Sequence, residues 1–219
     1  MGRELKTPEL STPERILAAA EREFAAVGYA PARLADIAGR AGIRRPSLLY
    51  HFSTKEVLYR AVVERVFDQL GAALTRSMNS EGPFEARLDA IVHGFTAFLD
   101  AHPTLAPIII REVVDEPEAS DEARRSGGSP GREIILERIA PLLTIIEQFI
   151  RDGGAESLRP QLPVRAALVE VASGLLLRSA SGSLRTPLWG PGDHALAIAR
   201  TIFLRDRANP NLNPPEPTP

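Results

Sequence analysis

The stretch AGIRRPSLLYHFSTKE, residues 41–56, combines a glycine, two arginines, a proline and a run of apolar and aromatic residues. A glycine that precedes a short helix is typical of the turn in a helix-turn-helix unit. Arg44 and Arg45 stand where that helix would begin, and a guanidinium group can donate paired hydrogen bonds to guanine. The segment therefore predicts a short helix that lies against DNA. The alternative is a solvated helix start with two ordinary surface arginines.

The rest of the chain predicts an all-α fold, because apolar residues recur at three- and four-residue spacing along nearly its whole length. The first helix is expected to begin at Ser11 or Thr12, either of which can cap it, with Glu14 completing a capping box with Ser11, and to stop at Gly28. Short helices follow over residues 33–40 and 44–52. Longer ones are expected over 54–78 (capped by Thr54), 84–100, 103–114, 131–151, 162–181 and 193–206.

Composition and charge narrow the class of protein. The chain has 219 residues, of which 44% are hydrophobic, and it has no cysteine, which excludes disulfides and thiolate metal sites. Residues 1–60 hold 10 Lys and Arg against 7 Asp and Glu, whereas the remaining 159 hold 16 against 21. Such a basic head on an acidic body suits a protein that meets phosphate at one end. Without an N-terminal apolar run or a long uncharged apolar stretch, a cytoplasmic protein with no membrane contact is expected.

Three motifs follow one another in the first part of the chain: ILAAAEREFAAVGY, LADIAGRAGI and PSLLYHFSTKEVL. In this order and at this spacing they resemble the TetR family of transcriptional regulators over residues 13 to about 60. The resemblance implies a homodimer in which a three-helix DNA-binding domain is joined by a long helix to a helical ligand-binding domain. Two positions depart from the family pattern: Leu49 replaces a common aromatic residue, and Ala32 with Arg33 replaces a common Ser or Thr.

The resemblance also implies a domain organisation and a set of DNA contacts. The expected divisions are a flexible segment 1–12, a helix-turn-helix domain 13–53, a ligand-binding and dimerisation domain 54–206, and a tail 207–219. Composition, and not the resemblance, predicts that the charged, Gly-, Ser- and Pro-rich stretch 115–131 is a mobile loop and that the Pro-rich tail is disordered. The expected DNA-contacting residues are Arg33, Arg44, Arg45, Pro46, Ser47, Tyr50, His51 and Lys55. Of these, Arg44, Arg45 and Ser47 would face bases or phosphates, Tyr50, His51 and Lys55 the DNA backbone, and Arg33 either a phosphate or its own helix surface.

The body offers apolar and aromatic residues that line a ligand cavity or form ordinary core. The candidates for a cavity are Phe67, His93, Phe95, Thr96, Phe98, Ile109, Arg111, Ile145, Gln148 and Phe149. A mostly apolar pocket would suit a hydrophobic or aromatic effector. The last two major helices are expected to pair with a second copy, through Leu168, Leu175, Leu176, Leu196, Ile198, Ile202 and Phe203.

Neither catalysis nor a metal or other cofactor is expected. The segment GGSPG, residues 127–131, matches the pattern of a hydrolase nucleophile elbow, but a polar acidic loop precedes it where a strand is needed, so Ser129 is not expected to be catalytic. No two histidines have metal-ligand spacing. His93 is expected in the core and His102 at a helix boundary.

These observations predict a homodimeric repressor that is released from a palindromic operator by a small molecule. A repressor without an effector and an activator remain as alternatives, and an all-helical enzyme or a protein-binding module is a more distant one.

Overall fold

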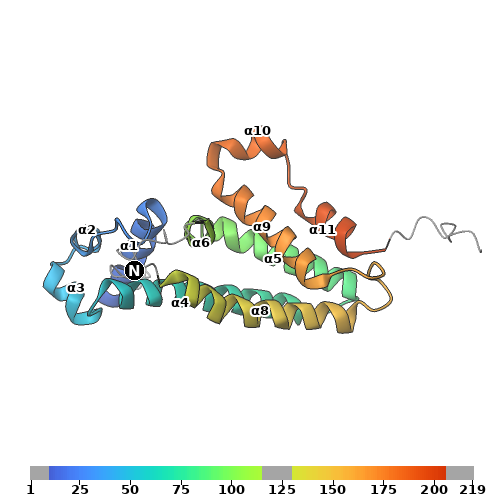
Figure 1. Ribbon diagram of the computed structural model, residues 1–219, viewed down its shortest axis with the longest axis horizontal. Coiled ribbons are helices and arrows are strands. Elements are labelled where there is room, and N and C mark those ends of the chain that lie inside the picture. Colours follow the sequence, from blue (N-terminus) through green and yellow to red (C-terminus); the bar gives the residue numbers. More distant parts are fainter. Residues whose placement is uncertain (1–9, 115–129, 206–219) are drawn as a thin grey trace, which may run out of the picture.

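The computed structural model describes residues 10–114 and 130–205, and these form helices joined by short connections (Figure 1). The all-α prediction is therefore confirmed. The predictions for the N-terminal segment, for the loop at 115–131 and for the Pro-rich tail fall wholly or mostly outside the described residues. No described helix is both long enough and apolar enough to cross a membrane.

Three helices gather at one end of the molecule and are called the head from here on: α1 (Thr12–Val27), α2 (Leu34–Arg40) and α3 (Arg45–His51) (Figure 1). The capping prediction for α1 is confirmed, because the N–H and hydroxyl of Ser11 donate to the Glu14 carboxylate at 2.8 and 2.7 Å. The helix stops at Gly28, whose φ of 85° is accessible to glycine at little steric strain.

The other helices form the body, and one of them also joins the head. They are α4 (Lys55–Met78), α5 (Phe84–Ala101), α6 (Leu105–Val114), α8 (Gly131–Gly153), α9 (Val164–Ala180), the 3-10 turn η1 (Gly182–Leu184), α10 (Arg185–Trp189) and α11 (Ala195–Phe203). Helix α4 runs from the head along the body, where α5 and α8 pack against it (Figure 1). The predicted cap of α4 is confirmed, since Thr54 Oγ1 accepts a hydrogen bond from the Val57 N–H at 3.1 Å.

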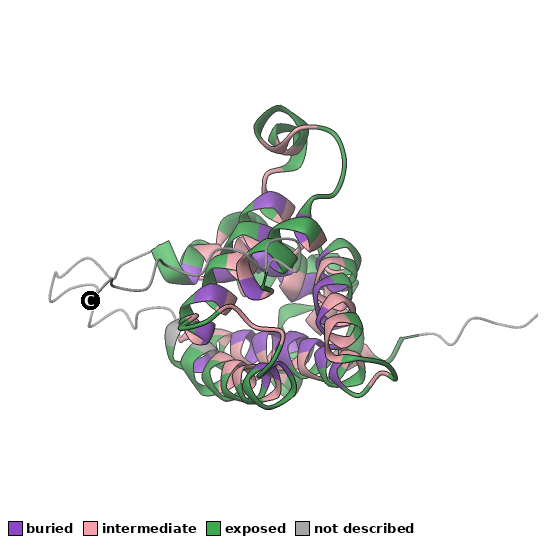
Figure 2. Cartoon of the chain, turned by 90° about the vertical axis from the view of Figure 1, so that its right-hand side faces the viewer, coloured by how far each residue is buried: buried purple, intermediate pink, exposed green. Residues whose placement is uncertain are grey.

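The sequence patterns did not predict η1 and α10. Both are short, and they lie between Gly182 and Gly190, so no apolar period of useful length exists there. In Figures 1 and 2 this segment projects from the rest of the body. His102 ends α5 as predicted.

Buried apolar residues line the inner faces of the helices in both head and body (Figure 2). Outside this core, α4 and α8 are joined by ion pairs: Arg60 lies 3.1 Å from Glu137, and Arg138 lies 3.1 Å from both Glu64 and Asp68. These side chains are partly or largely exposed, so each pair adds little stability alone. Burial of the apolar faces is the larger contribution.

Leu48 should be the anchor of α3, because it is fully buried while the adjacent Leu49 is only half-buried. Leu48→Ala is expected to lower the free energy of unfolding by about 2–5 kcal/mol, since it empties a packed site. Leu49→Ala is the matched control, with a smaller expected loss. Urea unfolding of the full chain measures both, and equal losses would contradict this account of the packing.

Candidate nucleic-acid interface

Helix α3 is attached to the head by one side and exposed on the other. Leu48 is its fully buried residue. The turn before it needs Gly42, whose φ of 70° is strained for other residues. Arg15 fixes this turn from α1, because its Nη2 donates to the Ala41 carbonyl at 2.6 Å. The opposite side of α3 is left facing solvent at the tip of the molecule (Figure 1).

The arginines of the head fall into two groups. Arg15 and Arg40 hold the head together: Arg15 binds the turn described above, and Arg40 lies 3.0 Å from the buried Glu23 carboxylate. The side chains of Arg22, Arg33, Arg44 and Arg45 are exposed and make no hydrogen bond or ion pair with any residue that the structure describes. All four are therefore available donors for an anionic partner. Arg22 lies on α1, whereas the other three stand at the starts of α2 and α3.

The remaining predicted contacts on α3 are also exposed. Pro46, Ser47 and His51 face solvent, and Tyr50 is 87% exposed, with its ring centroid 5.3 Å from that of His51. An aromatic residue this exposed is available to pack on or hydrogen-bond to a partner. Leu49, where the family pattern has an aromatic residue, is half-buried, so Tyr50 is the aromatic residue that α3 presents.

Lys55 is engaged differently from the prediction. Its Nζ donates to three carbonyls that follow α1, those of Tyr29, Ala30 and Ala32, at 2.9, 3.0 and 3.3 Å. It also lies 4.5 Å from the centroid of the Tyr29 ring. An ammonium group has three donors, and all three are used here. The structure therefore gives Lys55 the role of joining α4 to the loop between α1 and α2, and not of offering a proton to a phosphate.

Lys55 and Tyr29 sit in a partly buried cluster with Phe24 and Tyr59. The Tyr59 ring centroid lies 4.8 Å from that of Phe24 and 5.0 Å from that of Tyr29. Partial burial lowers the pKa of the Lys55 ammonium. Burial, followed by the charges of Glu56 and Glu112, raises the pKa of the Tyr29 phenol, which keeps that phenol neutral at ordinary pH.

The body meets α1 of the head through α6 and through Thr104, the residue before it. Thr104 donates to Glu21 of α1, and Arg111 Nη2 donates to the Ala26 carbonyl of α1 at 3.1 Å. A further contact of α6 is buried and joins it to α4, the helix that leads out of the head: the Tyr59 hydroxyl of α4 donates to Glu112 Oε1 at 2.5 Å.

Glu112 also connects α6 to the start of α8. Gly131, the first residue of α8, lies so close to the Glu112 carboxylate that a Cβ there would overlap it. The sequence analysis did not identify Tyr59 or Glu112, because neither belongs to a motif. A tyrosine and a glutamate among apolar neighbours were the available signal.

The structure does not assemble the predicted ligand residues into one cavity. Phe67, Phe98 and Ile109 are packed in the core, and Phe95 and Phe149 are half-buried against it. Four others are exposed and do not line an interior cavity: His93, Arg111, Ile145 and Gln148. Arg111 instead binds Ala26, Gln148 donates to Asp152, and His93 is not the core residue expected. Thr96 alone of the candidates lines the cleft between α5 and α9 described below.

The predicted dimer residues divide in the same way. Leu175 and Phe203 are 8% and 1% exposed because they pack inside the body, so they offer no surface to a second copy. Leu168, Leu176, Leu196 and Ile202 are half-buried against the core. Ile198, at 50%, is exposed, and so are Val169 and Leu177 of α9, at 41% and 53%, which the prediction did not include.

Among the described residues no group of three or more His, Asp or Glu side chains is placed to hold a metal ion. Ser129 lies outside the described residues. What the described structure brings together in the head is a short exposed helix with unengaged cations at its start, the geometry of a helix-turn-helix module that binds DNA.

Comparison with known proteins agrees with this class. Residues 16–62 match the family model described as bacterial regulatory proteins, tetR family. The chain is 29% identical to the HTH-type transcriptional activator FasR of Mycolicibacterium smegmatis over 160 residues. This aligned stretch covers 72% of this chain and 67% of FasR. The chain is 36% identical over 107 residues to the HTH-type transcriptional repressor Rv3405c of Mycobacterium tuberculosis, 46% of this chain and 54% of that protein.

The fold also matches solved structures over most of its length. One is the SmeT–triclosan complex, with a TM-score of 0.59 and 24% identity over 96% of this chain and 100% of that one. Residues 16–62 are a TetR-family DNA-binding domain, and the chain is a DNA-binding transcriptional regulator. Regulators of this family are transcription factors and not enzymes.

The role given to Lys55 predicts how binding depends on salt. Lys55→Met should weaken binding to all DNA sequences while leaving the slope of log K against log salt unchanged, because the ammonium is used inside the protein. Arg33→Ala should flatten the slope by about 0.9, the value for one lost phosphate contact. Fluorescence anisotropy at several salt concentrations measures both. A slope that changes equally in the two variants would refute the assignment of Lys55.

The buried contact between α4 and α6 predicts a loss of stability when it is removed. Tyr59→Phe removes the hydroxyl that donates to Glu112 and is expected to lower the free energy of unfolding by about 1–3 kcal/mol. Tyr29→Phe is the control, because the Tyr29 hydroxyl has no hydrogen bond with a described residue. Chemical unfolding measures both variants, and a Tyr59→Phe protein as stable as the control would contradict the importance of this contact.

Proposed function

We propose that the protein is a homodimeric repressor that binds a palindromic operator and is released from it by a small hydrophobic or aromatic molecule. The observation that carries the proposal is the set of three unengaged arginines, Arg33 at the start of α2 and Arg44 and Arg45 at the start of the exposed α3. Arginine at the start of such a helix is suited to guanine edges and phosphates. Division of the chain into a DNA-binding domain 13–53 and a ligand-binding and dimerisation domain 54–206 is part of the proposal.

Two copies are needed because one seven-residue helix reads few base pairs. A twofold dimer would place its two α3 helices in successive major grooves, about 34–36 Å apart. The surface that we propose for pairing lies on α9 and α11, where Val169, Leu177 and Ile198 are exposed. Exposed apolar residues on neighbouring helices favour burial against another surface.

Release requires that the body and head move together. Helix α6 is suited to this coupling, because it contacts α1 through Arg111 and through the preceding Thr104, and contacts α4 through Glu112. A ligand that binds the body better in one arrangement of these helices shifts the population toward it, and near-complete switching needs about a 10⁴-fold difference in affinity. The triclosan complex of the structural neighbour SmeT supports a small-molecule effector.

DNA retardation and oligomeric state together test the proposal. The purified protein should retard DNA from upstream of its own gene and should sediment as a dimer. Ile198→Asp should weaken the dimer because it places a charge in the proposed interface, and Val113→Asp, at another exposed apolar position, is the control. If the dimer does not retard this DNA at low salt, the proposal that the protein represses transcription by binding there is wrong.

An activator is the second candidate, because the relative FasR is named a transcriptional activator. Transcription in vitro from the retarded fragment separates the two. The proposed repressor lowers transcript yield when added to the polymerase, whereas an activator raises it. The same reaction with a metabolite panel identifies compounds that reverse the effect.

A further inference from the structure

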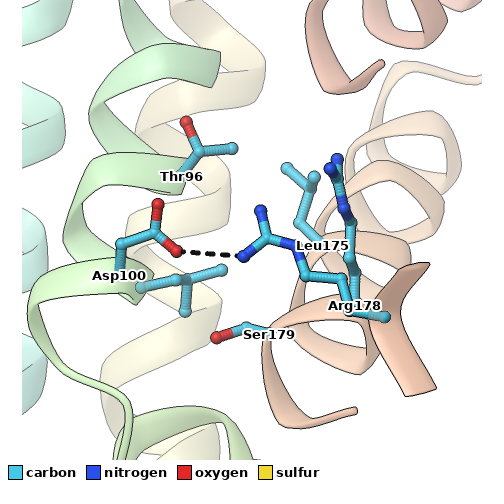
Figure 3. Close-up of a pocket in the computed structure, with 7 residues that line it drawn as sticks. Thr96, Asp100, Leu175, Arg178 and Ser179 are labelled. Atoms are coloured by element: carbon cyan, nitrogen blue, oxygen red, sulfur yellow. Dashed lines mark hydrogen bonds and ion pairs between the residues drawn. The ribbon is translucent and has the colours of Figure 1, made fainter. Parts of the chain in front are cut away.

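A small cleft lies between α5 and α9, on the side where α10 begins (Figure 3). Its walls are Thr96, Leu99 and Asp100 from α5, Leu175, Arg178 and Ser179 from α9, and Arg185 from α10. Two of these groups are cations and one is an anion. The cleft therefore concentrates hydrogen-bond donors at one place in the body.

Arg178 is the unusual member of the cleft, because it is charged and only 7% exposed. Its Nη1 lies 2.7 Å from Asp193, and its Nη2 donates to the Gly192 carbonyl. Its Nε is buried and has no hydrogen-bond partner among the described residues. A buried N–H group without an acceptor is destabilising and calls for an acceptor from outside the chain.

Arg185 is the second cation, and its intramolecular partner is weakly held. Arg185 Nη1 lies 3.5 Å from Asp100 Oδ1, and the two side chains are 41% and 64% exposed (Figure 3). An ion pair this exposed contributes little and exchanges readily with other partners. The Arg185 guanidinium can therefore turn to an incoming anion at small cost.

The neutral groups favour an acid with an apolar part. The Ser179 hydroxyl has no hydrogen bond with a described residue, so it can donate to an anion. Leu99 and Leu175, 2% and 8% exposed, form apolar walls beside the charged groups. The cleft has a volume of only about 10 Å³, which is room for about one water-sized group, so one oxygen of a head group enters it and the rest of a ligand must lie toward the open side.

We propose that this cleft binds the carboxylate of a small amphipathic acid. The Arg178 Nε–H, the Arg185 guanidinium and the Ser179 hydroxyl donate to the carboxylate oxygens, which replace Asp100 as the partner of Arg185. Guanidinium groups match the planar geometry of a carboxylate. The apolar part of the acid contacts Leu99 and Leu175. An effector role for the acid rests on the proposed function, whereas its binding does not.

The position of the cleft gives binding a route to the head. Helix α9 packs against α6, and α6 makes the contacts with α1 and α4 described above. Arg178 also holds Gly192 and Asp193, which precede α11. A carboxylate bound at Arg178 therefore affects the position of α9, which packs against α6, and of the residues that precede α11.

Calorimetry on the full-length protein without DNA tests the site, with hexanoate as the probe and hexanamide as its neutral counterpart. Hexanoate should bind and hexanamide should bind at least about tenfold more weakly, since charge-assisted hydrogen bonds are lost. Arg185→Ala should weaken hexanoate binding by about tenfold or more. Arg76→Ala is the control and should leave binding unchanged, because Arg76 is an exposed arginine of α4 whose side chain makes no hydrogen bond or ion pair with a described residue.

Arg178→Lys tests the buried donor, because lysine keeps a cation near Asp193 and lacks the Nε–H. Its hexanoate affinity should fall as in Arg185→Ala, with circular dichroism to check folding. Absence of hexanoate binding, equal binding of hexanamide, or an unaltered affinity in Arg185→Ala would each overturn the site, whether or not Arg178→Lys folds. DNA retardation without any acid is measured separately, so a failure of the proposed regulator is distinguished from a failure of the cleft.

Discussion

The rest of the structure depends on one face of α4, where Lys55 and Tyr59 lie one helical turn apart. Lys55 holds the three carbonyls that follow α1, and Tyr59 packs on Phe24 and Tyr29 while donating to Glu112 in the body. Because both residues belong to one continuous helix, head and body cannot rotate about α4 without breaking buried or partly buried contacts. The orientation of α3 is therefore tied to the packing of α6.

This constraint explains why net charge alone describes the DNA-binding surface poorly. The basic head contains several arginines, but Arg15 and Arg40 are used to hold the turn and α1. Lys55 is used in the same way. Only side chains that the fold leaves unengaged can neutralise phosphate, and among the described arginines of the head these are Arg22, Arg33 and the pair that opens α3. A basic composition predicts that such a surface exists without predicting its members.

The helix boundaries and the exposed helix of the head followed from local signals, since a capping pair such as Ser11 and Glu14 or a helix stop at Gly28 acts within a few residues. Helix α10 was missed because it is short and has no apolar period. The predictions of ligand and dimer residues were less accurate. Ile145, predicted to line a cavity, is exposed, and Phe203, predicted for the dimer surface, lies in the core. The type of a residue does not determine whether neighbouring helices cover the face of the helix on which that residue lies.

The sequence by itself determined the helical elements, the three-helix head and the family, because each of these depends on patterns within short stretches of chain. Tertiary structure alone decided what the buried polar groups do. Lys55 meets a carbonyl 26 residues away, and Tyr59 meets a carboxylate 53 residues away. Such contacts depend on how whole helices pack, and one side chain can meet water, phosphate or a backbone carbonyl according to that packing.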